Sequence, residues 1–152
     1  MDGRKAIKMK ILVLNGPNMN MLGIREPDIY GRETYQDLVD LVKREKGDRH
    51  EITFCQSNHE GDLVDAIQQA YFTGVQGIVF NPAAYTHTSV AIADAVKAVG
   101  IPTIEVHVSD PDSREEFRKV SYIRKAAAGT VAGRGFQGYI DAIDMLEEIA
   151  SR

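Results

Sequence analysis

A carboxylate and an imidazole stand two residues apart in the sequence Glu105-Val106-His107. Along an extended strand, alternate side chains point to the same face, so Glu105 and His107 would lie side by side. A neighbouring carboxylate fixes the tautomer of an imidazole ring and favours its protonated form. We therefore expect His107 to be a general acid oriented by Glu105, although a purely structural ion pair explains these two residues equally well.

An arginine and a tyrosine five residues apart suggest the complementary base. Arg25 and Tyr30 lie in a long irregular segment, residues 15–31, that is rich in Gly, Pro and Asn. A phenol, with a pKa of about 10, becomes a base at neutral pH only when a nearby cation lowers that pKa. Tyr30 activated by Arg25 is one interpretation. A tyrosine that packs onto the protein beside a solvated arginine is the other.

Other polar residues follow further apolar runs. His87, in the sequence Thr-His-Thr-Ser, is expected either to donate a hydrogen bond to a ligand or to cap a turn. Asp94 and Arg118 are by default surface charges, and His50 is expected to be solvated. Neither Cys-x-x-Cys nor His-Glu-x-x-His occurs, and no group of residues has the spacing of metal ligands.

Short apolar runs alternate with amphipathic stretches along the chain, which predicts a parallel sheet covered by helices. The predicted strands are residues 10–14, 51–55, 77–80, 103–108 and 130–132, and the predicted helices are residues 35–46, 60–72, 89–99, 114–127 and 137–150. This pattern predicts a flavodoxin-like, doubly wound α/β fold in three αβα layers, with five parallel strands in the order 2-1-3-4-5. Ligands of such sheets bind beyond the carboxyl ends of the strands, where the candidate residues would meet.

Length, net charge and cysteine count limit the number of domains, the kinds of partner and the location that we expect. A chain of 152 residues is expected to form one domain. Its formal net charge is −4 and it has no basic stripe, so no nucleic-acid partner is expected. No apolar run approaches the roughly 20 residues that span a bilayer, so no membrane partner is expected either. Cys55 is the single cysteine, which leaves no intrachain disulfide and suits a cytoplasmic protein.

The glycines at 133, 135 and 138 fit the Gly-x-Gly-x-x-Gly pattern of dinucleotide-binding turns. They follow the last predicted strand, however, and no further strand completes a βαβ unit. We therefore interpret them as a tight turn with close packing between strand and helix, not as a nucleotide site.

Six segments, taken together, resemble type II 3-dehydroquinate dehydratase. They are MKILVLNGPNMNMLGIREPDIYG, QSNHEGDLVDAIQ, NPAAYTHTSVAIADA, IEVHVSD, REEFRKVSY and GFQGY. The resemblance runs from Met9 to about Leu146, so we expect a single catalytic domain over residues 9–152 after a disordered extension over residues 1–8. It implies dehydration of 3-dehydroquinate to 3-dehydroshikimate, in the shikimate and quinate pathways, by anti elimination through an enolate without metal or cofactor.

The resemblance also implies catalytic roles. Tyr30 would remove the C2 proton beside the ketone, and Arg25 would keep its phenolate ionised. Asn18 would hold a water molecule against the enolate oxygen, where negative charge develops. His107, oriented by Glu105, would protonate the departing C1 hydroxyl.

Substrate-binding roles follow in the same way. Asn81 and the backbone amides of Val108 and Ser109 match positions that bind the substrate carboxylate. His87 and Arg118 match positions that hold the ring hydroxyls. The resemblance therefore raises Arg118 above its default interpretation as a solvated charge.

Assembly is implied by one further residue. Asp94 matches an aspartate that reaches the site of a neighbouring subunit, which implies trimers, and the family assembles four trimers into a dodecamer. The expected partners are the small-molecule substrate and further copies of the chain.

The sequence departs from the family pattern at a few positions. Met19 and Met21 stand where relatives often have Leu, which conserves volume. Arg134 stands where many relatives have an apolar residue. None of these changes falls on a residue with an expected catalytic role.

A non-catalytic flavodoxin-like module that binds a small anion is the alternative. Such a module would leave the Arg25–Tyr30 and Glu105–His107 pairs unexplained. The chain also lacks the acidic cluster after its first strand that a phosphate receiver needs to hold Mg²⁺.

Overall fold

The computed structural model describes residues 7–24, 28 and 32–152, so the expected extension, residues 1–8, is described only from residue 7. Five parallel strands form one sheet: β1 (Lys10–Asn15), β2 (Glu51–Gln56), β3 (Gly77–Asn81), β4 (Thr103–His107) and β5 (Gly129–Ala132). Their spatial order is β2-β1-β3-β4-β5. The predicted order is confirmed, and the direction of winding reverses between β1 and β3.

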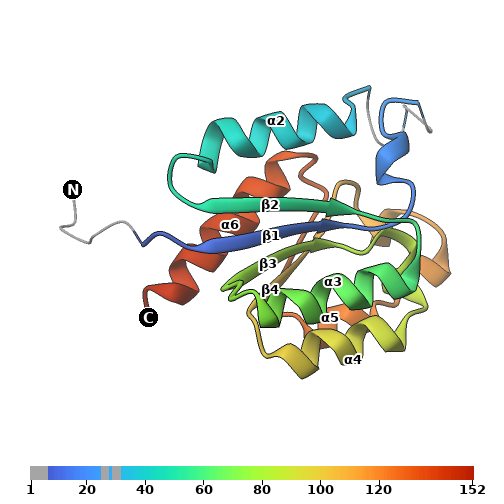
Figure 1. Ribbon diagram of the computed structural model, residues 1–152. Helices are drawn as coiled ribbons and strands as arrows, with labels where there is room; N and C mark the ends of the chain where they lie inside the picture. The colour runs from blue at the N-terminus through green and yellow to red at the C-terminus, as the bar shows by residue number, and fades with distance from the viewer. Residues whose placement is uncertain (1–6, 25–27, 29–31) are drawn as a thin grey trace.

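Helices cover both faces of this sheet (Figure 1). On one face lie α2 (Tyr35–Lys46) and α6 (Gln137–Ala150); on the other lie α3 (Glu60–Phe72), α4 (Val90–Val99) and α5 (Tyr122–Ala126). Side chains alternate along β1, so Ile11 and Val13 are buried in the first core while Leu12 and Leu14 are buried in the second. The predicted three-layer αβα architecture is therefore confirmed.

Three amide side chains end three neighbouring strands in register. Asn15 is the last residue of β1 and pairs with Gln56 of β2 on one side and with Asn81 of β3 on the other. Asn15 and Asn81 are both buried. The carboxyl edge of the sheet is therefore polar although the strands behind it are apolar.

The chain after β4 differs from its prediction. The predicted helix over residues 114–127 is instead one 3-10 turn, η4 (Glu116–Lys119), followed by the short α5; another 3-10 turn, η3 (Pro111–Ser113), precedes them. Glu115 and Val120 have extended backbones, with ψ of 151° and 130°. Phe117 remains 62% exposed, so the segment lacks the buried apolar stripe that would hold a long helix on the sheet.

The turn between β5 and α6 is confirmed as a structural feature. Gly133 and Gly135 have positive φ angles of 75° and 56°, which L side chains rarely adopt. A Cβ at Gly138 would lie 3.3 Å from Val131 and 3.4 Å from Val106. These glycines allow α6 to turn tightly and pack closely on the sheet.

His50 was expected to be solvated, and this expectation is wrong. Its ring is 3% exposed; its Nδ1 accepts from the Met9 amide at 3.0 Å and its Nε2 lies 2.7 Å from a Glu147 carboxylate oxygen. Lys46 bridges Glu147 and Asp144 at 2.8 and 2.6 Å. This buried polar cluster ties the start of β1 to α2 and α6 at the edge opposite the candidate site. Within the described ranges, no helix has the length and apolarity needed to cross a membrane.

Candidate active site

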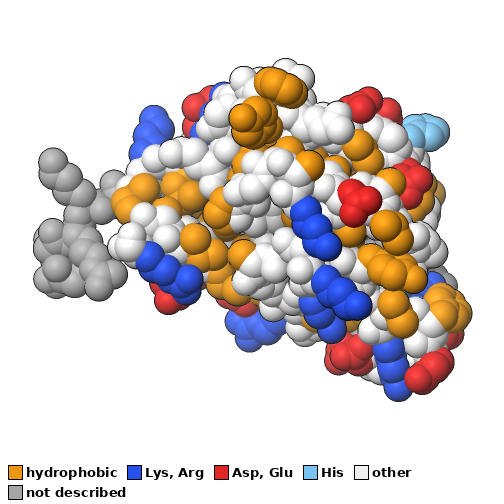
Figure 2. Space-filling model, turned by 90° about the horizontal axis from the view of Figure 1, so that it is seen from below, with side chains coloured by type: hydrophobic (Ala, Val, Ile, Leu, Met, Phe, Trp, Pro, Cys, Tyr) orange, Lys and Arg blue, Asp and Glu red, His pale blue; other side chains and the backbone are white. Residues whose placement is uncertain are grey.

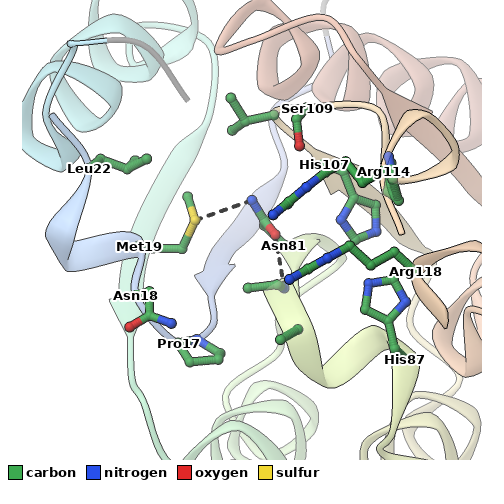
Figure 3. A pocket seen from close by; sticks show the side chains of 14 residues that line it. Pro17, Asn18, Met19, Leu22, Asn81, His87, His107, Ser109, Arg114 and Arg118 are labelled. Carbon is green, nitrogen blue, oxygen red and sulfur yellow. Dashed lines mark hydrogen bonds between the residues drawn. The ribbon is translucent and has the colours of Figure 1, made fainter. Parts of the chain in front are cut away.

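A pocket lies beyond the carboxyl ends of the strands, where the fold predicts a ligand site (Figure 3). Its wall is built from three segments that follow strands: η1 (Met19–Met21) after β1, η2 (Ala83–His87) after β3, and the chain after β4. The predicted site residues that line it are Asn18, Asn81, His87, His107, Val108, Ser109 and Arg118. Residues distant in the sequence thus meet at one end of the sheet.

The Glu105–His107 pair is formed as predicted. Both side chains project from the same face of β4, and the His107 Nε2 lies 2.6 Å from a Glu105 carboxylate oxygen. Glu105 is fully buried, whereas His107 is 7% exposed and borders the pocket. The carboxylate therefore lies behind the imidazole, on the side away from a ligand.

Further side chains surround the carboxylate. Thr130 donates to its Oε1 at 3.3 Å, and the Arg124 Nε lies 3.8 Å from that oxygen, whereas His107 bonds the Oε2. Thr86 and Ser121 donate to the same Glu105 oxygen at 2.6 and 2.8 Å. Burial alone would raise the pKa of Glu105, but the hydrogen bond and charge of His107 and the two hydroxyl donors lower it to about 2. Glu105 is therefore an ionised carboxylate at neutral pH.

An ionised carboxylate can only accept hydrogen bonds, so the His107 Nε2 must carry the hydrogen that lies between them. The remaining ring nitrogen, Nδ1, is the atom through which His107 can exchange a proton with a ligand. The geometry suits a general acid whose tautomer is fixed from behind.

Asn81 presents an amide whose orientation is fixed by its partners. Its Oδ1 accepts from the Ala83 amide at 3.0 Å, and its Nδ2 donates to the Met19 sulfur at 3.4 Å (Figure 3). The Nδ2 also donates to the Tyr139 hydroxyl at 3.0 Å. The Tyr139 hydroxyl in turn donates to the Asn15 side chain. Burial raises the pKa of Tyr139 far above its usual value despite the Asn81 hydrogen bond, so this hydroxyl keeps its proton.

His87 faces the pocket from η2. Its Nδ1 donates to the Val120 carbonyl at 2.6 Å. Burial lowers the pKa of His87, as do the nearby His107 and Arg118, while the Val120 carbonyl opposes the shift. The lowered pKa favours the neutral ring, in which the Nδ1 carries the hydrogen and the Nε2 can accept from a ligand hydroxyl.

Arg118 and Arg114 supply positive charge to the pocket from the chain after β4. The Arg118 Nε bonds Glu115 at 2.6 Å, and the Arg114 Nε lies 4.0 Å from the same carboxylate. Their side chains are only 18% and 15% exposed, so neither is an ordinary solvated charge. Arg118 thus lies at the wall of the pocket.

The remaining predicted residues divide into three cases. Asn18 lines the pocket in a left-handed conformation with φ of 69°, and its backbone N–H donates to the Asn58 side-chain oxygen at 3.0 Å. Asp94 is exposed on α4 and does not line this chain's own pocket. Arg25 and Tyr30 lie outside the described residues.

Sequence reasoning missed several residues of the site. Arg114 stands four positions before Arg118, and that repeat of arginines after the acid was the available signal. Thr86 and Ser121 lie 19 and 16 positions from Glu105, so only the folded chain reveals them. Tyr139, 58 positions from Asn81, is the last residue of the GFQGY segment, and that motif was the available signal.

A metal site finds no support in the part of the chain that the structure describes. There, no group of three or more His, Cys, Asp or Glu side chains is arranged to hold a metal ion. The ionisable groups at the pocket are instead an imidazole pair, a buried carboxylate and two guanidinium groups.

Comparison with known proteins gives consistent results. The family model for dehydroquinase class II matches residues 9–147. The 3-dehydroquinate dehydratase of Corynebacterium glutamicum is 55% identical over 142 residues, covering 92% of this chain and 97% of the relative. The crystal structure of type II dehydroquinase from Butyrivibrio crossotus superposes with a TM-score of 0.89 at 53% identity, covering 91% of this chain and 97% of that one. The Propionibacterium acnes type II dehydroquinase gives a TM-score of 0.86 at 39% identity, with coverage of 95% and 99%.

Proposed function

We propose that this chain, which belongs to the dehydroquinase class II family, is a hydro-lyase that removes water from 3-dehydroquinate to give 3-dehydroshikimate. This reaction is the dehydration step of the shikimate pathway. The substrate is a small carboxylate with a ketone and several hydroxyls. It suits a pocket that presents amides, an imidazole acceptor and guanidinium groups.

The observation that carries the proposal is the ionised, fully buried Glu105 behind His107 at the pocket. A hydroxide is a poor leaving group, so elimination needs an acid that protonates it. His107 has a fixed tautomer, one free ring nitrogen and a position at the pocket wall. A module that only bound an anion would have no use for a buried charge that orients an imidazole.

Removal of the C2 proton needs a positioned base and stabilisation of the enolate that forms. We assign these roles to Tyr30, ionised beside Arg25, and to Asn18 acting through a water molecule. Asn18 at the pocket wall is consistent with this role. The Tyr30 and Arg25 assignments rest on family resemblance.

We assign substrate binding to five other residues of the pocket wall. Asn81 and the backbone amides of Val108 and Ser109 would hold the carboxylate. His87 would accept from a ring hydroxyl through its Nε2, and Arg118 would donate to another. All five residues line the pocket, which supports this arrangement.

Assembly is part of the proposal. We assign Asp94 to the site of a neighbouring subunit within a trimer, and four trimers to a dodecamer in the cytoplasm. Asp94 is exposed on α4. On the face of the molecule that Figure 2 shows, apolar side chains lie among charged ones. Tyr71 and Phe72 at the end of α3 are 60% and 76% exposed, as expected of surfaces that a neighbouring subunit covers. A mass in solution near twelve times 16.8 kDa is the expected result of light scattering.

The activity is tested by adding 3-dehydroquinate and following the ultraviolet absorbance of the conjugated enone that dehydration creates. An absorbance rise is expected without added metal. No rise with well-folded protein would refute the proposed reaction. Inactivation by borohydride in the presence of substrate would indicate an imine intermediate and contradict the assignment of Tyr30.

Two variants test the proposed base and the proposed acid one at a time. Tyr30→Phe and His107→Asn should each lower kcat by about 10²–10⁴, the usual contribution of a positioned acid or base. His59→Asn is the control for the second change, because His59 is exposed and caps α3 without a side-chain bond. Near-normal turnover by Tyr30→Phe would remove that residue from the mechanism.

A further inference from the structure

The Asn81 amide has no spare hydrogen in the ligand-free site. One Nδ2 hydrogen is directed at the buried Tyr139 hydroxyl and the other at the Met19 sulfur, at 3.0 and 3.4 Å. The Oδ1 must face the Ala83 amide, which is a donor only, so the side chain cannot be turned over. Any ligand oxygen that Asn81 binds through its nitrogen must therefore replace one of these two partners.

The two partners are unequal. The Tyr139 hydroxyl is fully buried and is itself anchored on Asn15, beneath the floor of the pocket. Met19 lines the pocket, and its thioether sulfur is a weak acceptor. A carboxylate is a much stronger acceptor for an amide hydrogen, because the bond is charge-assisted. The sulfur is the partner that a carboxylate displaces.

We propose that Met19 is a positioning residue that holds the Asn81 amide until the substrate carboxylate takes the place of its sulfur. This inference rests on the proposed function, in which Asn81 binds that carboxylate. In the free protein the sulfur keeps a buried N–H paired, while Ala83 and Tyr139 fix the direction in which the amide faces. On binding, the N–H···S bond is exchanged for an N–H···O bond, and no covalent bond changes.

The exchange carries a cost in affinity. Part of the energy that the carboxylate gains on Asn81 is offset by the bond that the sulfur loses. Leucine at this position has nearly the same volume but no acceptor, so it removes the competing bond and leaves the packing intact.

The test compares Met19→Leu with Met21→Leu. Met21 is 40% exposed, does not line the pocket and makes the same chemical change, so it is a matched control. Met19→Leu should lower KM for 3-dehydroquinate by about two- to tenfold, the worth of one weak hydrogen bond. The kcat should stay unchanged, because the N–H···S bond is already broken in both the bound ground state and the transition state.

A binding measurement isolates the carboxylate. Quinate keeps the ring carboxylate but lacks the ketone that acidifies C2, so it binds without reacting. Calorimetry should show a lower Kd for quinate with Met19→Leu than with wild type. The Kd for quinate methyl ester, which lacks the negative charge, should differ less between the two proteins. An equal change for both ligands, or a KM that rises in Met19→Leu, would overturn the proposal.

A third measurement uses the unmodified protein. The chain has five methionines, so methyl-¹³C-methionine labelling gives five resonances at most. The Met19 resonance is the one missing from Met19→Leu, and it should shift on addition of quinate while that of Met21 stays in place. An unmoved Met19 signal at saturation would refute the exchange. Absence of turnover in wild type would instead refute the proposed function, so the two failures are distinct.

Discussion

Replacing Glu105 by Gln keeps the shape of the side chain and removes its charge. In the native protein this carboxylate accepts from His107, Thr86 and Ser121, which together hold its pKa at about 2 against an ordinary value of 4.5. Gln can accept the same three hydrogen bonds through its oxygen. The substitution therefore tests what the charge contributes, separately from the bonds' geometry.

The size of the effect on stability follows from the lowered pKa of Glu105. A folded pKa of about 2 and an unfolded value of 4.5 differ by about 2.5 units, which corresponds to about 3 kcal/mol of stability. Because the folded pKa is the lower one, this stabilisation is fully present above pH about 4.5 and is lost as the pH falls towards 2. Glu105→Gln lacks this contribution at every pH.

The assay is urea denaturation of both proteins at pH 7, 5, 4 and 3, at one protein concentration. Glu105→Gln should be less stable by about 3 kcal/mol at pH 7 and 5, and this difference should shrink steadily below pH 4.5. Glu116→Gln is the control, since Glu116 has an 88% exposed side chain and its loss should change stability by less than about 0.5 kcal/mol. A difference that is the same at pH 3 and pH 7 would refute the assignment of a buried, ionised Glu105.

Three further changes test other parts of the structure. Tyr139→Phe removes the acceptor of one Asn81 hydrogen and the donor to the buried Asn15 oxygen. It should therefore cost about 1–3 kcal/mol in urea denaturation and raise KM; unchanged values of both would contradict the assigned network. Gly16→Ala places a Cβ 2.5 Å from the Pro82 carbonyl oxygen, where Gly61→Ala meets open space. The first should lower kcat/KM by about 10–100-fold and the second should not, and equal effects would contradict the close approach. His50→Leu removes two buried hydrogen bonds and should cost about 1–3 kcal/mol without changing kcat; a lower kcat would show that this edge acts on the site.

The sheet was predictable because its signals are local. Short runs such as residues 77–80 are apolar throughout, as strands buried on both faces require. The alternation of strands and helices along the chain indicates a doubly wound parallel sheet. The Glu105–His107 pair was predictable for the same reason, since alternation along one strand is enough to place both side chains together.

The chain after β4 was not predictable in this way. Residues 114–127 have the composition of a helix, but helices in proteins are held mainly by tertiary burial of an apolar face. Here Ile123 is the buried residue of α5, while Phe117 and Val120 remain exposed. The segment is held instead by polar bonds such as that of Ser121, the N-cap of α5, to Glu105, which no local pattern encodes.

Two site features depend on contacts across the fold. The partners of Asn81 and His87 come from residues 58 and 33 positions away, so the direction of each hydrogen bond was unknown from the sequence. For His87 this decides the chemistry, because the Val120 carbonyl takes the Nδ1 hydrogen and leaves an acceptor at the pocket. The wrong expectation for His50 has the same cause, because its partner Glu147 lies 97 positions away in the sequence.

The pairing of β1 with β3 also affects the chemical stability of the Asn15 side chain. Asn15-Gly16 is the kind of dipeptide in which asparagine most readily loses ammonia, through attack of the next backbone nitrogen on the side-chain amide. Here the Gly16 nitrogen donates to the Asn81 carbonyl at 2.7 Å, and Asn15 is fully buried in an extended strand. The nitrogen that would attack is thus held against a neighbouring strand. The pairing of β1 with β3 therefore protects the Asn15 side-chain amide from deamidation.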